Sequence, residues 1–215
     1  MSLHLRAFAI VAASLLLVTP VRATPVITAI LDETNVFNFS NTITVGYGFR
    51  VSSPQDATAL GMWDLNADGF TGAVDVGLWD GAGSLLGAVT LGAGTSGTLI
   101  DGFRYVDLVS AVPLQAETLY VLGGFRASGV QYLARDTRPG LDFLVAAGVT
   151  IVDERASSSF GGEPTVEFPD FVFDVGQALV GPNALLAPIP EPVSAALLGL
   201  GLLGIAGVRR TRGSG

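Results

Sequence analysis

The amino-acid sequence predicts an all-β fold, an antiparallel β-sandwich or jelly roll, with an N-terminal signal peptide before it and a C-terminal transmembrane helix after it. Three observations predict this arrangement. Short segments alternate apolar and polar residues, turns rich in Gly, Asp or Asn separate them, and no long amphipathic helix lies between them. The long apolar runs stand at the two ends of the 215 residues instead.

Composition limits the classes of protein that this chain can represent. The sequence is 49% hydrophobic and 14% charged, which excludes a disordered or collagen-like chain. Its formal charge of −8 comes without a basic patch, so nucleic acid is not an expected partner. All 11 basic residues are Arg, Cys is absent, and His4 is the only His.

The first 23 residues have the organisation of a secretory signal peptide. Arg6 precedes a short apolar run over residues 7–18, and Val21 and Ala23 then predict cleavage after Ala23. The alternative is an N-terminal membrane anchor, but twelve residues are too few to cross a hydrocarbon core of about 30 Å comfortably. The Sec translocation machinery is therefore the expected partner for export.

Residues 24–186 form the expected exported domain. It carries 18 acidic residues against six arginines, and without Cys it has to be held together by its core. Residues 141–147 fit a short helix between two glycines, and residues 153–169 read as a long loop. Alternation predicts strands at residues 42–51, 73–79, 85–91, 103–109 and 118–125, with a late strand at 171–175.

The tetrapeptide Gly-x-Trp-Asp occurs twice, at residues 61–64 and 77–80. In both copies an aromatic strand end is followed by an Asp, whose side chain can begin a turn by accepting backbone N–H groups. The repeat therefore predicts two similar turns, one at Asp64 and one at Asp80. Two copies do not indicate a propeller.

The first of these turns also fits the template of a calcium-binding loop. Gly69 would permit the sharp bend at position 6, and oxygen atoms on alternate residues would converge on a hard cation. A bare turn is the favoured interpretation and calcium the alternative, because Gly72 offers no side chain at position 9 and position 12 is the short Asp75. The calcium ligands would be Asp64, Asn66, Asp68, the carbonyl of Phe70, and Asp75.

The tripeptide Gly-Phe-Arg occurs three times, ending at Arg50, Arg104 and Arg126. Alternation places Phe and Arg on opposite faces of a strand, so we expect the Phe rings in the core and the Arg heads in water. Separate solvated arginines are the favoured interpretation. The alternative is a patch of the three arginines that binds carboxylates or acidic sugars.

Residues 24–186 contain no His, Cys or Lys, which removes most catalytic groups. A Ser-His-Asp triad, a cysteine nucleophile, a zinc site with His ligands and a Schiff-base lysine are all excluded. We therefore expect no enzyme. The alternative is a secreted, carboxylate-based glycoside hydrolase, for which the candidate pairs are Asp153 with Glu154 and Glu163 with Glu167.

A secreted carbohydrate-binding module is a further alternative. Aromatic rings can stack on sugar rings, although for Trp63 and Trp79 a place in the core is the favoured interpretation. The candidate stacking residues are Trp63, Trp79, Tyr105 and Tyr132.

Residues 187–215 consist of three parts in a fixed order. The prolines around Glu191 hold the chain extended, since each fixes φ and disfavours helix. An uncharged run over residues 193–208 follows. Its sixteen residues as a helix cover about 24 Å, slightly under the hydrocarbon thickness, and the run can just span a bilayer with Pro192 and Glu191 at one interface and arginines that reach the other. A cluster of arginines then marks the cytoplasmic side: Arg209, Arg210 and Arg212.

This C-terminal segment resembles the PEP-CTERM sorting signal of Gram-negative bacteria. The resemblance rests on Pro190, Glu191 and Pro192, on the apolar run, and on the terminal arginines. It implies processing by exosortase, a membrane-embedded enzyme, near the Pro-Glu-Pro motif, and an association with exopolysaccharide and biofilm matrix. An unprocessed single-pass anchor is the alternative.

The alternating strands also resemble a bacterial β-sandwich domain of unknown function that is found before such tails. The residues that carry this second resemblance are Val-Gly-Leu-Trp-Asp at 76–80 and Gly-Phe-Arg-Tyr at 102–105. It implies a sandwich and no particular activity. Together, the two resemblances lead us to expect an exported, non-enzymatic cell-envelope or extracellular-matrix protein that is sorted through its tail.

Overall fold

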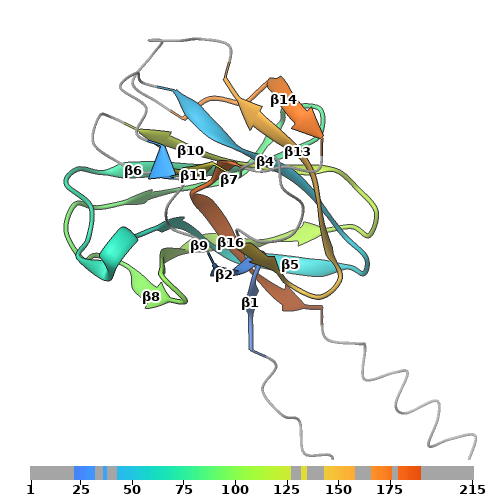
Figure 1. Ribbon diagram of the computed structural model, residues 1–215. Helices are drawn as coiled ribbons and strands as arrows, with labels where there is room; N and C mark the ends of the chain where they lie inside the picture. The colour runs from blue at the N-terminus through green and yellow to red at the C-terminus, as the bar shows by residue number, and fades with distance from the viewer. Residues whose placement is uncertain are drawn as a thin grey trace, which may run out of the picture.

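Apart from one 3₁₀ turn, the regular structure in the described part of the chain is β-strand. The computed structural model describes residues 22–31, 36–37, 43–126, 132–134, 143–157, 166–175 and 179–189. Two large antiparallel sheets face each other (Figure 1). The all-β prediction is confirmed, and the two facing sheets are consistent with the predicted β-sandwich.

The two large sheets have five and six strands. The five-stranded sheet has the order β1 (Thr24–Pro25), β16 (Pro182–Pro188), β5 (Gln55–Trp63), β9 (Phe103–Leu114) and β8 (Thr98–Ile100). The six-stranded sheet has the order β14 (Phe171–Val175), β13 (Val149–Ala156), β4 (Thr44–Val51), β10 (Tyr120–Arg126), β6 (Val74–Asp80) and β7 (Leu85–Leu91).

Two smaller sheets and one 3₁₀ turn complete the described structure. They are β15 (Leu179–Val180) with β11 (Tyr132–Ala134) and β3 (Val36–Phe37), β12 (Phe143–Val145) with β2 (Ile27–Ile30), and the turn η1 (Leu65–Ala67).

Most predicted strands are present, and two predictions are wrong. Strands β4, β6, β7, β9, β10 and β14 lie where alternation and composition placed them. The helix expected over residues 141–147 is not formed at Phe143–Val145, because these residues pair with β2 as a strand. The loop expected over residues 153–169 starts too early, since β13 continues to Ala156 in register with β4.

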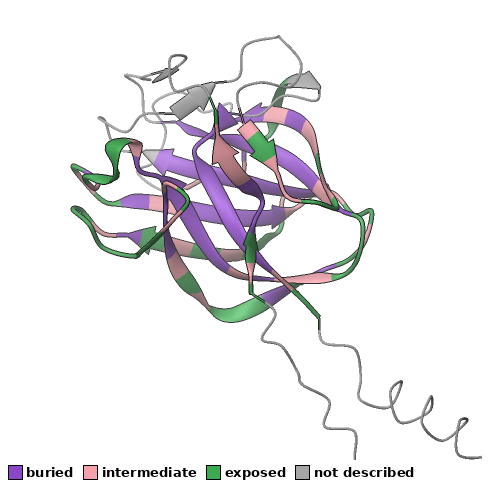
Figure 2. Cartoon of the chain, turned by 60° about the horizontal axis from the view of Figure 1, so that its bottom comes forward, coloured by how far each residue is buried: buried purple, intermediate pink, exposed green. Residues whose placement is uncertain are grey.

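The core lies between the two large sheets, where β4, β5, β6, β10 and β16 are buried along most of their length (Figure 2). Tyr47, Phe49, Leu78 and Leu122 of the six-stranded sheet are fully buried. Tyr120 stabilises the connection from β9 in one sheet to β10 in the other. Its hydroxyl accepts a hydrogen bond from the backbone N–H of Gln115 at 2.8 Å. A tyrosine at the start of a strand that bonds back to the preceding connection is typical of Greek-key sandwiches.

The strand registers define two ends of the sandwich. At one end, Pro188 pairs with Gln55 and Leu114 pairs with the same residue from the other side. We call this the tail end, because β1 begins and β16 finishes there. At the other end Trp63 pairs with Phe103, and the connections 64–73 and 92–97 lie beyond it. We call this the loop end.

Segments from the beginning and the end of the chain are joined along β16, from Leu186 near the tail end to Asn183 towards the loop end. Thr24 and Pro25 pair with Leu186 and Leu185. The buried Asn183 then binds the backbone of Ile27 twice, with its Oδ1 accepting the N–H at 3.1 Å and its Nδ2 donating to the carbonyl at 2.9 Å. An amide side chain satisfies a buried backbone in this way at little cost.

Candidate functional site

The loop between β5 and β6, at the loop end, is the candidate site. It begins at Asp64, directly after β5, and passes through η1 to a bridge between Phe70 and Gly94. Its backbone is tightly wound, with φ of 57° at Ala67 and 95° at Gly69. Gly69 is required twice, because this φ favours glycine and because a Cβ would lie 2.4 Å from the backbone carbon of Gly94.

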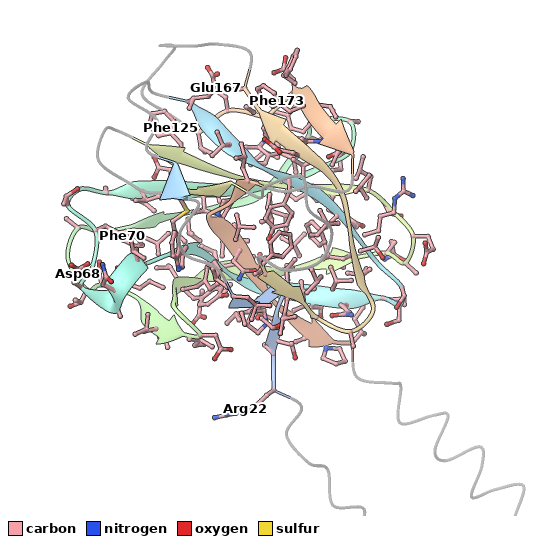
Figure 3. All side chains as sticks on the ribbon, in the orientation of Figure 1. Arg22, Asp68, Phe70, Phe125, Glu167 and Phe173 are labelled. Atoms are coloured by element: carbon pink, nitrogen blue, oxygen red, sulfur yellow. The ribbon has the colours of Figure 1, made fainter. Side chains whose placement is uncertain are left out.

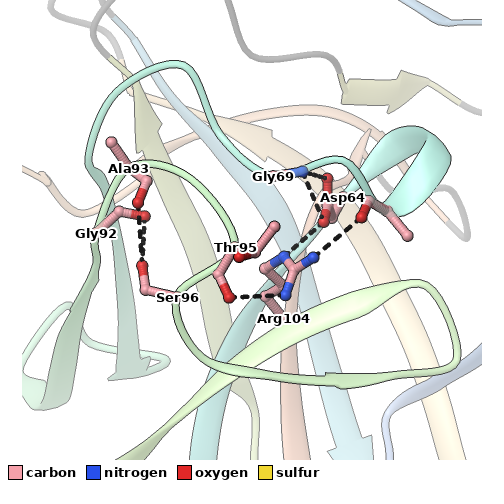
Figure 4. A network of polar contacts seen from close by, with 8 residues as sticks. Asp64, Gly69, Gly92, Ala93, Thr95, Ser96 and Arg104 are labelled. Atoms are coloured by element: carbon pink, nitrogen blue, oxygen red, sulfur yellow. Dashed lines mark hydrogen bonds and ion pairs between the residues drawn. The ribbon is translucent and has the colours of Figure 1, made fainter.

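Arg104 of β9 fills the centre of this loop (Figure 4). Its Nε donates to Oδ2 of Asp64 at 2.6 Å, its Nη2 to the carbonyl of Ala67 at 3.1 Å, and its Nη1 to the carbonyl of Thr95 at 2.9 Å. The Asp64 carboxylate also accepts the N–H of Gly69, at 2.9 Å and 3.2 Å to its two oxygens. The guanidinium thus joins two loops and one strand into a single network.

Both partners of this ion pair are almost completely enclosed. The side chains of Arg104 and Asp64 are 7% and 1% exposed. Removing two charges from water costs several kcal/mol each, and only good geometry with further hydrogen bonds repays that cost. The three acceptors around the guanidinium supply those bonds, so the chain provides its own cation at the point where the loop oxygens converge.

Two of the expected calcium ligands are used elsewhere. Asp75 lies within β6, where its carboxylate accepts the hydroxyl of Thr90 on β7. The carbonyl of Phe70 accepts the N–H of Gly94 at 2.7 Å. Neither atom is directed at the carboxylate of Asp64, and the five expected ligands are not brought together.

The remaining calcium ligands differ in exposure. Asn66 and Asp68 are exposed, whereas Asp64 is buried and held by Arg104. Within the described ranges, no group of three or more acidic, His or Cys side chains is placed to hold a metal ion. Calcium binding therefore stays a prediction, and an ion would have to displace Arg104 to use this loop as expected.

The second Gly-x-Trp-Asp copy forms the predicted turn at the tail end of the sandwich. Oδ1 of Asp80 accepts the N–H groups of Ala82 and Ser84, each at 2.9 Å. These bonds, the one from Ser84 above all, lower the pKa of Asp80. Both predicted turns are thus confirmed, one buried around an arginine and one accessible to solvent.

The arginines of the Gly-Phe-Arg repeats have different environments. Arg50 lies in the six-stranded sheet and donates to the carbonyl of Glu117 at 2.7 Å, whereas Arg104 lies in the five-stranded sheet. The side chain of Arg126 lies outside the described residues. The expectation of solvated heads is wrong for Arg104, because two loops fold over its guanidinium. The alternation of apolar and polar residues along a strand does not show which other segments cover a given face of the sheet.

A second buried ion pair lies on β13. Arg155 donates two hydrogen bonds to the carboxylate of Asp153, from Nε at 2.6 Å and from Nη2 at 2.9 Å. The N–H of Gly48 donates to the same carboxylate at 3.1 Å. The guanidinium lies 5.9 Å from the ring centroid of Phe168, within cation–π range. This pair explains how three consecutive charged residues can form a strand instead of the predicted loop.

The candidate carboxylate pairs of a hydrolase do not assemble in the described residues. Asp153 and Glu154 are neighbours in a strand, so their side chains leave opposite faces of the sheet. Glu163 lies outside the described residues. The backbone N–H of Glu167 donates a hydrogen bond to the hydroxyl of Thr44 at 3.0 Å.

The candidate sugar-stacking rings are buried where the structure describes them. Trp63, Trp79 and Tyr105 are each 3% exposed. The core interpretation is confirmed for Trp63, which belongs to the core between the sheets, whereas Trp79 is buried outside that core. Trp79 forms a separate apolar layer on the outer side of the six-stranded sheet, where its ring packs against Phe168 at 6.1 Å. The side chain of Tyr132 lies outside the described residues.

The residues of the expected sorting signal lie outside the described residues. This applies to Pro190, Glu191 and Pro192, to the apolar run 193–208, and to Arg209, Arg210 and Arg212. Of the helical structure in the described ranges, none has the length and apolar character needed to cross a membrane.

Comparison with known families matches residues 32–172 to a domain of unknown function, DUF4082. The matched stretch contains Arg104 and both loops of its network, but not β1, β2 or β16. Comparison with curated proteins gives no match. Since the family match covers more than half of the 215 residues, the chain belongs to the DUF4082 family.

Proposed function

We propose that the chain is an exported, non-enzymatic protein of the cell envelope or extracellular matrix. The β-sandwich is the cargo and residues 187–215 are its sorting signal. Residues 1–23 direct export, and residues 193–208 then hold the protein in the membrane. Exosortase cleaves near Pro190, Glu191 and Pro192 and passes the domain to the cell surface or the exopolysaccharide matrix.

The position at which the folded domain ends carries this proposal. β16 runs to Pro188 and pairs with β5 along its length, and the Pro-Glu-Pro motif begins two residues later. A cut within the motif would leave every described strand intact. A cut five residues earlier would remove part of β16, including the buried Leu186. Cleavage at the motif would therefore release the domain undamaged, which supports the proposal.

The buried charges support a cargo without catalytic chemistry. A glycoside hydrolase needs one carboxyl group as an acid and another as a base or nucleophile. The buried carboxylates of Asp64 and Asp153 are each held by an arginine. Their use is thus structural.

Mass spectrometry of the protein from its native host tests the proposal. The expected result is a mature chain that begins near Thr24 and ends near Pro190, recovered outside the inner membrane. Recovery of the intact C-terminus from membranes would support the permanent anchor instead. Full-length protein in the cytosol would overturn export altogether.

A motif variant with a matched control tests whether Pro-Glu-Pro is the signal. We expect Glu191→Gln with Pro192→Ala to retain the full-length chain in the membrane fraction. The control is the Glu-Pro pair inside the domain, changed by Glu163→Gln with Pro164→Ala, which should be processed like the natural chain. Equal processing of both variants would refute the role of the motif.

A further inference from the structure

The tail end of the sandwich carries a shallow groove where the chain enters and leaves the domain. Its volume is about 190 Å³. Its lining includes no charged side chain, although the sequence as a whole is acidic. The lining residues are Thr24, Gln55, Ala146, Ala147, Leu186 and Pro188.

The distance from this end to the apolar run is fixed by the sequence. Only residues 189–192 separate the last residue of β16 from the run at 193–208. The five Cα–Cα steps from Pro188 to Val193 span at most about 18 Å when fully extended. The loop end is much farther away, because the nine residues of β5 that separate the two ends cover about 30 Å.

We infer that, until its C-terminal segment is cleaved, the tail end of the sandwich rests on the membrane surface, with a lipid bilayer as its partner, and that the Arg104 loop points away from it. The inference rests on the proposed function, since it requires residues 193–208 to lie in the membrane. With that run inserted, the groove is held within about 18 Å of the lipid and cannot move farther out.

The chemistry of the tail end fits a membrane interface held by a tether. Ile189 is 40% exposed, Pro188 and Ala147 are exposed, and Arg22 projects from the start of β1 (Figure 3). Asp80 and Glu117 also lie towards this end, so charge attraction to anionic lipid is not what holds it. The short connection to the membrane-inserted run keeps the tail end close to the bilayer, so the tail end needs no affinity of its own for lipid.

Because the sequence has no Cys, single-cysteine labels can test the orientation in the full-length chain. Ala147→Cys labels the tail end and Ala93→Cys the loop end, and both residues are exposed alanines outside every ion pair. Each variant is labelled with a fluorophore and reconstituted into phosphatidylcholine vesicles that contain a lipid with a nitroxide on its headgroup.

The expected result is flotation of both variants with the vesicles and at least about threefold stronger quenching at position 147 than at position 93, because only the former is within reach of the surface. Inserting twelve Gly and Ser residues between Ile189 and Pro190 should then relieve the quenching. Flotation with equal quenching at both positions would overturn the orientation and leave the anchor standing. Failure to float would overturn the membrane anchor in the proposed function, and the orientation with it.

Discussion

The two Gly-x-Trp-Asp turns share a tetrapeptide and a local hydrogen-bond pattern, and they differ in burial and in charge pairing. At each, the Asp carboxylate accepts backbone N–H groups a few residues ahead: Gly69 for Asp64, and Ala82 with Ser84 for Asp80. Asp64 is 1% exposed and paired with Arg104, whereas Asp80 remains accessible to solvent and no ion pair holds it in the described structure.

This difference separates local from long-range causes. The turn itself is local chemistry, because an Asp side chain competes with the main chain for nearby N–H groups wherever it follows a strand. The burial of Asp64 depends on a residue 40 positions away in the sequence. The same four letters therefore produce an exposed hairpin turn in one place and the polar core of a loop cluster in the other.

Removing Arg104 should produce the largest effect. Arg104→Met leaves the carboxylate of Asp64 buried without its cation and should cost about 3–5 kcal/mol of unfolding free energy. Urea denaturation of the purified domain measures it. Arg50→Met is the control, because Arg50 is only partly buried and donates to one carbonyl. If the two variants lost equal stability, the buried network would have no special importance.

Exchanging each Asp for Asn should sharpen the comparison. Asp64→Asn keeps the shape but loses the charge opposite Arg104, and we expect a loss of about 2–4 kcal/mol. Asp80→Asn should lower the melting temperature far less, since water can serve the same N–H groups. Thermal unfolding followed by circular dichroism compares them. A larger loss at position 80 would contradict the assignment of long-range and local roles.

Glycine should be favourable at one turn and unfavourable at the other. Ala67 has a φ of 57°, which is strained for any residue with a Cβ, so Ala67→Gly should stabilise the domain by about 0.5–1 kcal/mol. Ala82→Gly in the Asp80 turn should destabilise it slightly, because no strain is relieved there. Denaturation curves of the two variants should give changes in unfolding free energy of opposite sign. Changes of the same sign would show that the backbone at Ala67 is not strained.

The smallest effect concerns pH and belongs to the exposed turn. The pKa of Asp80 is lowered below its ordinary 3.8 by the N–H of Ser84. A lowered folded-state pKa contributes stability above the unfolded-state pKa and loses it as the pH falls through the folded-state pKa. The carboxyl resonance of Asp80 should titrate below that of an unfolded reference in an NMR pH series. Ser84→Pro removes this N–H and should raise the pKa of Asp80 towards its ordinary value.

The sequence predicts those parts of this molecule whose causes lie within a few residues. Both Asp turns and six strands follow from alternation and turn chemistry. Strand β13 is not predicted, because charged residues such as Asp153 and Arg155 are expected in solvent. The structure shows that the two form a buried ion pair, which allows them to lie in a strand. Strand β16 is not predicted either, because a proline stands at each of its ends, Pro182 and Pro188, and proline disfavours the assignment of a strand inside a sheet.

The candidate site shows the same limit. The loop from Asp64 to Gly69 is evident from the sequence as a sharp, oxygen-rich turn, but the calcium template does not describe the positions of Phe70 and Asp75, which bond elsewhere. The identity of the central cation could not be read from the loop, because Arg104 stands on another strand. Alternation gives the face on which an arginine leaves a strand, but the covering of that face is a property of the whole fold.

The joining of the first and last strands sets when the domain can fold. Asn183 meets Ile27 across 156 residues of sequence, and β16 lies between β1 and β5 inside its sheet. A chain that emerges from the N-terminus onward lacks this strand until almost all of the domain has been synthesised. Contacts so distant in sequence form slowly. The sandwich can therefore close only after its final strand, β16, has emerged.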